Sequence, residues 1–148
     1  MTTLVPGLPV TVTRETIAYF RREGPPTSSV VELNEETGGH AMYALHDPVH
    51  GLKAGAHHAG AEADPDMDGE PDAALVERIA AWVRERLPDA DPEPAGAEIC
   101  LYTSTADESF VLERRGRVVV GSACSGHGFK FAPAVGRRLA ALAVEAPA

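Results

Sequence analysis

The stretch "LPVTVTRETIAYFRR", residues 8–22, is rich in β-branched and aromatic residues and therefore predicts one long strand. Shorter stretches of similar composition follow at 28–34, 40–47 and 51–58, separated by Gly, Pro, Asn and Glu residues. Strands that follow one another without a helix between them favour an α+β fold over an alternating βαβ fold. The sequence thus predicts a mainly antiparallel or mixed sheet.

One strong helical pattern interrupts these strands. The segment "DAALVERIAAWVRERL", residues 72–87, repeats apolar side chains at helical spacing, and Pro71 suits the first turn of such a helix. The acidic segment 61–72 predicts a solvated loop before this helix, and 88–96 predicts a linker after it. The apolar positions of the helix are Leu75, Ile79, Trp82, Val83 and Leu87.

Three further strands and a second helix complete the predicted fold. The segments "AEICLYTST" (97–105), "SFVLERR" (109–115) and "RVVVGSACS" (117–125) have the composition of strands. A last helix is predicted from about residue 132 to residue 145. The expected fold class is α+β, with two main helices and no internal repeat.

Composition and charge limit the classes of function. A chain of 148 residues with 44% apolar residues can bury a sizeable core as one domain. The net charge of −9 and the pI near 5.0 argue against nucleic acid or an anionic membrane as partner. The first ten residues have no basic region typical of a signal peptide. Two cysteines do not make a disulfide framework, so we expect a cytoplasmic protein.

Lysine is rare in this chain. Of the 13 basic residues only Lys53 and Lys130 are lysines, and the other positions are arginine. Because an ammonium is a compact point charge and a guanidinium is a planar fork, retained lysines are candidates for positions that need the ammonium itself. Chance placement is the open alternative.

Alternation along two predicted strands brings polar side chains onto one face. In "GLKAGAHH", Lys53, Gly55 and His57 share the face opposite Leu52, Ala54 and Ala56. The missing side chain of Gly55 leaves backbone open to a flat ligand. A solvent-facing edge strand with ordinary polar residues explains the same pattern, and both explanations remain open.

The strand at 97–105 places two reactive side chains together. Cys100 and Tyr102 share one face, and the opposite face, expected to point into the core, carries Ala97, Ile99 and Leu101. An inert half-buried thiol is the plain alternative for Cys100. We expect Cys124, in the apolar run of the last strand, to serve packing.

The segment "SGHGFKF", residues 125–131, lies where the last strand becomes the last helix. Such a corner exposes backbone N–H groups and the positive end of the helix dipole, which favours an anion. A tight turn whose glycines only satisfy geometry is the alternative. The six histidines match no closed zinc motif, so no metal site is predicted.

The segments "CLYTSTADESFVLE" (100–113) and "VVVGSACSGHGFKFAPAVGRRLA" (118–140) closely resemble the C-terminal signature of monomeric sarcosine oxidase and N-methyltryptophan oxidase. These enzymes are flavin-dependent oxidases of N-methyl amino acids. The likeness extends more loosely through 8–20 and 51–58, and so covers nearly the whole chain.

The resemblance implies roles around the flavin ring. Cys100 would be joined covalently to the 8α carbon of FAD, and Lys53 would lie near N5 and promote the reaction with oxygen. His57, Tyr43 and Tyr102 would line the same catalytic site, with Tyr102 facing the substrate. The segment that follows Tyr43 is one residue shorter than the corresponding segment of the family.

The resemblance also gives the corner 125–131 a role. Gly126, His127 and Gly128 would lie along the flavin, and Lys130 would bind the substrate carboxylate. Both lysines of this arginine-preferring chain then stand at the two lysine positions that the family's chemistry uses. The reaction implied is oxidation of a secondary or N-methyl amino acid to an imine, with oxygen reduced to hydrogen peroxide.

The family's N-terminal nucleotide-binding motif is not found in this sequence. No strand–GxGxxG–helix pattern with a following acidic residue is present. By resemblance, residues 1–95 would be part of a substrate-binding domain, and 96–148 the strands and helix that return to a missing FAD-binding domain. A separately encoded FAD-binding half is the expected partner. An inactive truncated remnant and a non-catalytic subunit that binds amino-acid-like ligands remain alternatives.

Overall fold

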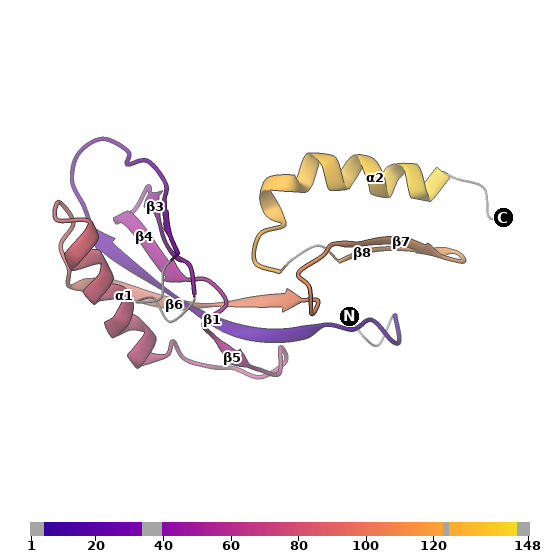
Figure 1. Cartoon of the computed structure of the whole chain (residues 1–148), viewed down its shortest axis with the longest axis horizontal. Helices are drawn as coiled ribbons and strands as arrows, with labels where there is room; N and C mark the ends of the chain where they lie inside the picture. The colour runs from indigo at the N-terminus through magenta and orange to yellow at the C-terminus, as the bar shows by residue number, and fades with distance from the viewer. Residues whose placement is uncertain (1–4, 34–39, 123–124, 145–148) are drawn as a thin grey trace. The chain divides into compact units, whose positions relative to one another are not determined.

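The computed structural model describes residues 5–33, 40–122 and 125–144, and it confirms the α+β class. The chain divides into two compact units, Thr13–Leu101 and the described parts of 1–12 and 102–148. The strands are β1 (Thr11–Arg21), β2 (Val30–Glu32), β3 (Met42–Asp47), β4 (Gly51–Ala56), β5 (Ala61–Glu62), β6 (Pro94–Ser104), β7 (Val111–Arg115) and β8 (Val118–Ser122). The helices are α1 (Ala73–Arg86) and α2 (Ala132–Val144), with a 3₁₀ turn η2 (Phe129–Phe131) before α2 (Figure 1).

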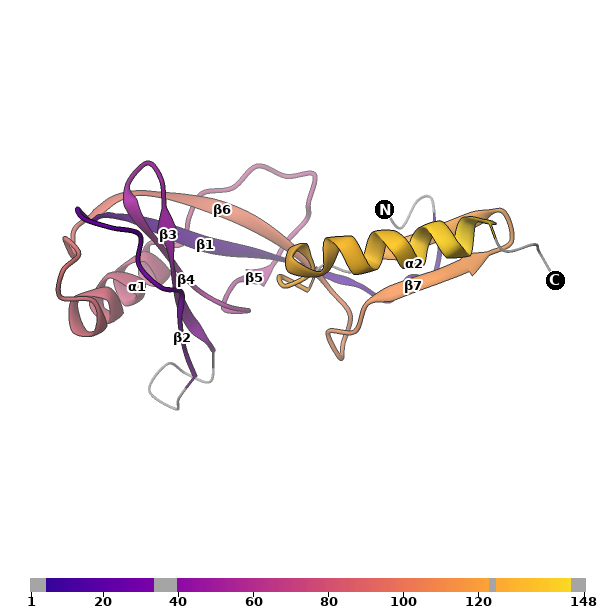
Figure 2. The same ribbon diagram turned by 90° about the horizontal axis from the view of Figure 1, so that it is seen from above.

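The unit Thr13–Leu101 is built on a sheet with strand order β2-β3-β4-β1-β5. Strand β6 also pairs with β1, and Figure 2 shows the two running side by side. The pairs between β2, β3, β4, β1 and β5 are antiparallel, as the consecutive strands predict. Because Ala54 pairs with both Ala18 and Ala44, these three side chains lie on one face of the sheet.

The core of this unit lies between α1 and that alanine-bearing face. Leu52, Ala54 and Ala56 are buried there, which confirms the face predicted from alternation along β4. Helix α1 contributes Ile79, Trp82 and Val83 to the same cluster, at the helical spacing predicted for them. The apolar side chains of β4 and those of α1 therefore pack together in one apolar layer.

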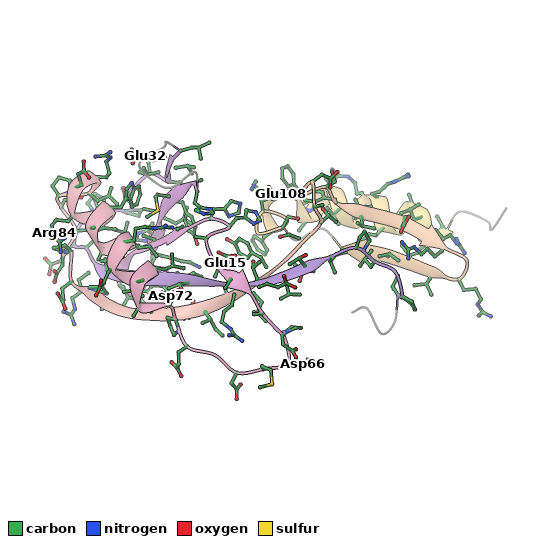
Figure 3. All side chains as sticks on the ribbon, turned by 60° about the horizontal axis from the view of Figure 1, so that its bottom comes forward. Glu15, Glu32, Asp66, Asp72, Arg84 and Glu108 are labelled. Carbon is green, nitrogen blue, oxygen red and sulfur yellow. The ribbon has the colours of Figure 1, made fainter. Side chains whose placement is uncertain are left out.

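Polar contacts at both ends fasten α1 to the sheet. The Asp72 side chain caps the helix by accepting from the backbone N–H groups of its first turn, and its own N–H donates to Thr16 Oγ1 over 2.9 Å (Figure 3). Pro71, expected in the first turn, precedes this cap. Near the other end, Trp82 Nε1 donates to Glu32 on β2 over 2.6 Å, and Arg86 pairs with the same carboxylate.

The second unit contains the β7–β8 hairpin and α2. Its helix contacts both strands, as Figure 1 shows. Gly121 on β8 allows close approach, since a Cβ there would lie 2.7 Å from a methyl group of Leu139. Arg114 on β7 donates to the carbonyl oxygen of Leu142 over 3.0 Å. The hairpin and the helix thus form a small two-layer body.

Strand β6 corrects two expectations. It begins at Pro94, so residues 94–96 belong to the strand and not to the predicted linker. The face with Ala97, Ile99 and Leu101 does not enter the core: Ala97 is exposed and Leu101 is 41% exposed. The physical reason is that β6 pairs beside β1, while α1 covers β1, β3 and β4 and leaves β6 outside the cluster.

The segment 61–72 is also more ordered than expected, because β5 pairs with Thr13 and Arg14 of β1. Arg14 Nη2 donates to the carbonyl of Met67 over 2.9 Å, which ties the loop to the same strand. Within the described residues, no helix is long and apolar enough to cross a membrane.

Replacing Asp72 tests how much the N-cap of α1 stabilises the fold. Asp72→Ala removes the acceptor of two backbone N–H groups, and we expect it to lower the free energy of unfolding by about 1 kcal/mol. Urea denaturation of the two proteins measures the difference. Asp66→Ala, on the exposed loop before α1, is the matched control and should leave stability within about 0.5 kcal/mol.

Candidate functional site

The face of the sheet opposite α1 carries Tyr43 and Lys53, two of the residues predicted to be functional. Alternation and the register of the ladders define this second face, since its residues pair with one another across the strands. Its members are Glu15, Ile17 and Tyr19 on β1, Tyr43 and Leu45 on β3, and Lys53 and Gly55 on β4. Lys53 stands opposite Tyr19 on one side and Leu45 on the other.

Gly55 is covered by an aromatic ring. A Cβ built on Gly55 would lie 2.5 Å from Tyr43 Oη and 2.7 Å from the ring carbon that bears it. The backbone of Gly55, expected to be open to a flat ligand, therefore faces the phenol of Tyr43. Glycine is needed here because the neighbouring strand's own side chain occupies the space.

Cys100 lies half-buried on β6, in the same unit as Lys53. Burial raises the pKa of the Cys100 thiol, because a thiolate loses solvation there. The Lys53 ammonium lowers this pKa, while the carboxylates of Glu15 and Glu98 raise it further. The net shift is upward, so the neutral thiol is favoured.

A second polar cluster extends along the same part of the sheet. Tyr19 Oη donates a short hydrogen bond to the Glu98 carboxylate, which raises the pKa of Tyr19 to about 12. The Tyr19 ring lies 4.8 Å from that of His50, and His50 Nδ1 is 3.0 Å from Asp47 Oδ1. The backbone and side chain of His50 hold the pKa of Asp47 below its usual value.

His57 follows the last residue of β4. Its backbone N–H donates to the carbonyl of Ala41 over 2.8 Å, and its ring packs edge-on against His58 with centroids 4.2 Å apart. His58 itself has a φ of 56°, a left-handed conformation at the turn toward β5. The turn thus fixes the backbone at which His57 leaves the strand.

The corner 125–131 belongs to the second unit. Ser125 is buried and its N–H donates to the carbonyl of Thr103 over 2.8 Å. Gly126 has a φ of 69° and lies against the ring of Tyr102, so that a side chain there would collide with the ring. Tyr102 is buried as a result. Both demands on Gly126 are geometric, which supports the tight-turn explanation for that residue.

The rest of the corner is more open. His127 Nδ1 donates to the carbonyl of Ser125 over 2.8 Å, and its ring lies 5.3 Å from that of Phe110. Gly128 is the N-cap residue of the 3₁₀ turn η2, which leads into α2. Lys130 is exposed, with its Nζ 5.4 Å from the centre of the Phe131 ring. Cys124, predicted to serve packing, falls outside the described residues.

The predicted site residues therefore fall into two groups. Lys53, Tyr43, His57 and Cys100 lie in the unit Thr13–Leu101, and Tyr102, Gly126, His127, Gly128 and Lys130 lie in the other. Glu15, Tyr19 and Glu98 were not among the residues predicted from the sequence. Alternation along 8–22 puts Glu15 and Tyr19 on one face and was the signal that could have found them.

Comparison with known proteins gives one family. The family described as DAO, FAD dependent oxidoreductase, matches residues 2–142. The human protein named peroxisomal sarcosine oxidase is 35% identical over 151 residues, which cover 93% of this chain and 39% of that protein. N-methyl-L-tryptophan oxidase of Yersinia pestis (strain Pestoides F) is 30% identical over 156 residues, which cover 97% of this chain and 41% of that protein.

A solved structure agrees with the fold. NikD, described as an unusual amino acid oxidase essential for nikkomycin biosynthesis, superposes with a TM-score of 0.70 at 24% identity. The match covers 95% of this chain and 40% of NikD. The chain thus spans about two fifths of the length of the relatives it matches.

The Tyr19–Glu98 hydrogen bond predicts an unusual titration. We expect Tyr19 to ionise with a pKa of about 12. The measurement is a pH titration of tyrosinate absorbance, in which the signal of Tyr19→Phe is subtracted from that of the wild type. Because this pKa is raised on folding, the bond stabilises the fold below pH of about 10 and the effect is lost as the pH rises through about 12. Glu98→Ala, which removes both the acceptor and the charge, should return the midpoint toward about 10. A Tyr19 midpoint near 10 in the wild type would contradict the assignment.

Proposed function

Because the chain belongs to the DAO family of FAD-dependent oxidoreductases, we propose that it is part of an amine oxidase acting on a secondary or N-methyl amino acid. Two electrons and two protons leave the C–N unit of the substrate, an imine remains, and oxygen takes up the two electrons and two protons to become hydrogen peroxide. Relatives named sarcosine oxidase and N-methyl-L-tryptophan oxidase support this substrate class. The activity is proposed for the whole protein, since the chain spans about two fifths of those relatives.

One structural observation carries the proposal: Lys53 stands on the sheet face that also carries Tyr43, and the half-buried Cys100, whose pKa its ammonium lowers, lies in the same unit. FAD supplies the acceptor for the substrate's two electrons when it is bound. The donor set fits this cofactor, because a thiol can hold it covalently and a fixed cation can stabilise negative charge beside it. We propose Cys100 as the covalent attachment point.

Lys53 is proposed to act on oxygen. Its ammonium stabilises the negative charge that develops on oxygen during reduction, and the effect is strongest in a site that excludes water. Tyr43 and His57, from the same unit, are proposed to line the catalytic site. The contact of Tyr43 with Gly55 fixes the position of the phenol.

The corner 125–131 is proposed to hold substrate and cofactor. Lys130 is exposed and carries a point charge suited to a substrate carboxylate. Gly126, His127 and Gly128 are proposed to lie along the flavin, and Tyr102 to face the substrate. Gly128 precedes the 3₁₀ turn Phe129–Phe131, which leads into α2.

We also propose how the chain divides into two functional portions. Residues 1–95 are assigned to the substrate-binding portion and 96–148 to the FAD-binding portion. The two compact units divide after Leu101, close to this boundary, while the described residues before Thr13 group with the second unit. The length of the relatives that this chain does not span would come from the same polypeptide or from a separately encoded FAD-binding half. The cysteine content favours the cytoplasm.

The first experiment is to denature the purified flavin-containing protein in acid and record the flavin absorbance that stays with the polypeptide. We expect retained flavin in the wild type and its loss in Cys100→Ser, because the thioether survives denaturation and the hydroxyl cannot replace the thiol. Cys124→Ser is the matched control and should retain the flavin. Flavin that is released from the wild type would rule out covalent attachment through Cys100.

Replacing each of the two lysines is expected to impair a different step of the reaction. Lys53→Met should slow reoxidation of the reduced protein by oxygen by about 100-fold, because charge on oxygen loses its partner. Lys130→Met should raise KM by about tenfold with little change in that rate, because the substrate carboxylate loses an ion pair. Stopped-flow reoxidation and steady-state kinetics separate the two. Equal effects of both changes on reoxidation would contradict the assignment.

A further inference from the structure

A row of side-chain contacts crosses the sheet and has no part in the proposed reaction. Asp47 Oδ1 lies 3.0 Å from His50 Nδ1, and the His50 ring packs against the Tyr19 ring with centroids 4.8 Å apart. Tyr19 Oη in turn donates to Glu98 Oε1. These four residues, here called the Tyr19 cluster, connect the turn between β3 and β4 with β1, and β1 with β6.

The Tyr19 cluster lies beside Lys53. Tyr19 and Lys53 are direct partners in the ladder between β1 and β4, so both side chains stand on the face opposite α1. The Cβ atoms of such partners are about 5 Å apart. The ring that bonds to Glu98 is therefore the cross-strand neighbour of the ammonium proposed to act on oxygen.

The other end of the cluster lies beside Cys100. Glu98 and Cys100 are two residues apart on β6, which pairs with β1. Alternate residues of a strand share one face and lie about 7 Å apart, so the bond from Tyr19 to Glu98 puts the Cys100 side chain on the face that carries Lys53. Burial raises the pKa of Cys100, and the opposing effect of the Lys53 ammonium agrees with this placement.

Core packing does not hold β6 in place. Among the described residues, the apolar cluster under α1 includes no side chain from β6, and Leu101 beside Cys100 is 41% exposed. The position of Cys100 thus depends on the pairing of β6 with β1 (Figure 2) and on the side-chain bond between Tyr19 and Glu98. Bond formation is sensitive to such placement, because a misplacement of about 1 Å can cost about 100-fold in rate.

We propose that Tyr19 is a positioning residue for Cys100, which holds β6 through Glu98 and thereby fixes the sulfur beside the cofactor. This rests on the proposed function, in which Cys100 is the attachment point. Attachment forms one S–C bond in place of the thiol S–H bond and one C–H bond of the 8α methyl group. The two electrons and two protons set free reduce one oxygen molecule to hydrogen peroxide.

The test is the rate at which acid-stable flavin absorbance appears after FAD is added to the flavin-free whole protein. Tyr19→Phe keeps the ring on His50 but removes the donor, and we expect it to slow attachment by about tenfold. Glu98→Ala should slow it by the same factor, and the double variant should be no slower, since both changes remove one bond. Glu98→Gln keeps an acceptor and should attach flavin at the wild-type rate.

Two further measurements separate positioning from a merely structural role. The Kd for FAD before attachment, read from flavin fluorescence, should stay within about twofold of the wild type in Tyr19→Phe. Glu93→Ala removes an exposed carboxylate just before β6 and should attach flavin at the wild-type rate. An affinity for FAD that falls by the same factor as the attachment rate would overturn the proposal.

The remaining outcomes also decide. Glu98→Gln as slow as Glu98→Ala would mean that the charge acts and the bond does not, which overturns the proposal. Attachment at the wild-type rate in Tyr19→Phe overturns it as well and leaves the proposed function standing. A wild-type protein that never acquires acid-stable flavin would overturn both this role of Tyr19 and the proposed attachment through Cys100.

Discussion

The packing of α1 on an alanine-lined sheet face is the constraint on which the larger unit depends. Ala18, Ala44 and Ala54 are fully buried and cross-paired on three adjacent strands, so the helix can approach the sheet closely. Trp82 and Ile79 fill the space that these small side chains leave. With one face closed in this way, every polar side chain of alternate register must lie on the other face. The candidate site is thus a consequence of how the core is packed.

The local pattern of apolar and polar residues correctly predicted those strands and helices that have one apolar face and one polar face. In β4 the alternation of apolar and polar residues matches the face under α1 and the face opposite α1, and in α1 the helical period of Ile79 and Val83 matches the core. In β6 the same reasoning failed at Leu101, because which face of a strand is covered depends on a partner that no local pattern specifies. The short strand β5 was missed for a similar reason: its pairing with Arg14 links residues far apart in the chain.

The candidate site shows the same limit. Lys53 was singled out because lysine is rare in this chain, and the role proposed for Cys100 came from resemblance to a family to which the comparison assigns residues 2–142. Glu15 was missed although its strand was predicted. Its importance lies in burial and in a hydrogen bond to Gly60, 45 residues away, and neither can be read from a polar residue at an alternate position. Chemistry-bearing residue types are visible in a sequence, whereas the residues that tune them are visible mainly in the fold.

The hydrogen bond between Glu15 and Gly60 limits which residues the turn after β4 can carry. The N–H of Gly60 donates to a carboxylate that is almost fully buried, and a Cβ at position 60 would lie 2.1 Å from the carbonyl oxygen of Arg14. A larger residue at position 60 would push the turn away from β1 and leave the buried Glu15 side chain with one hydrogen bond fewer. The smallest residue in the turn is thus a condition for keeping a carboxylate inside the unit.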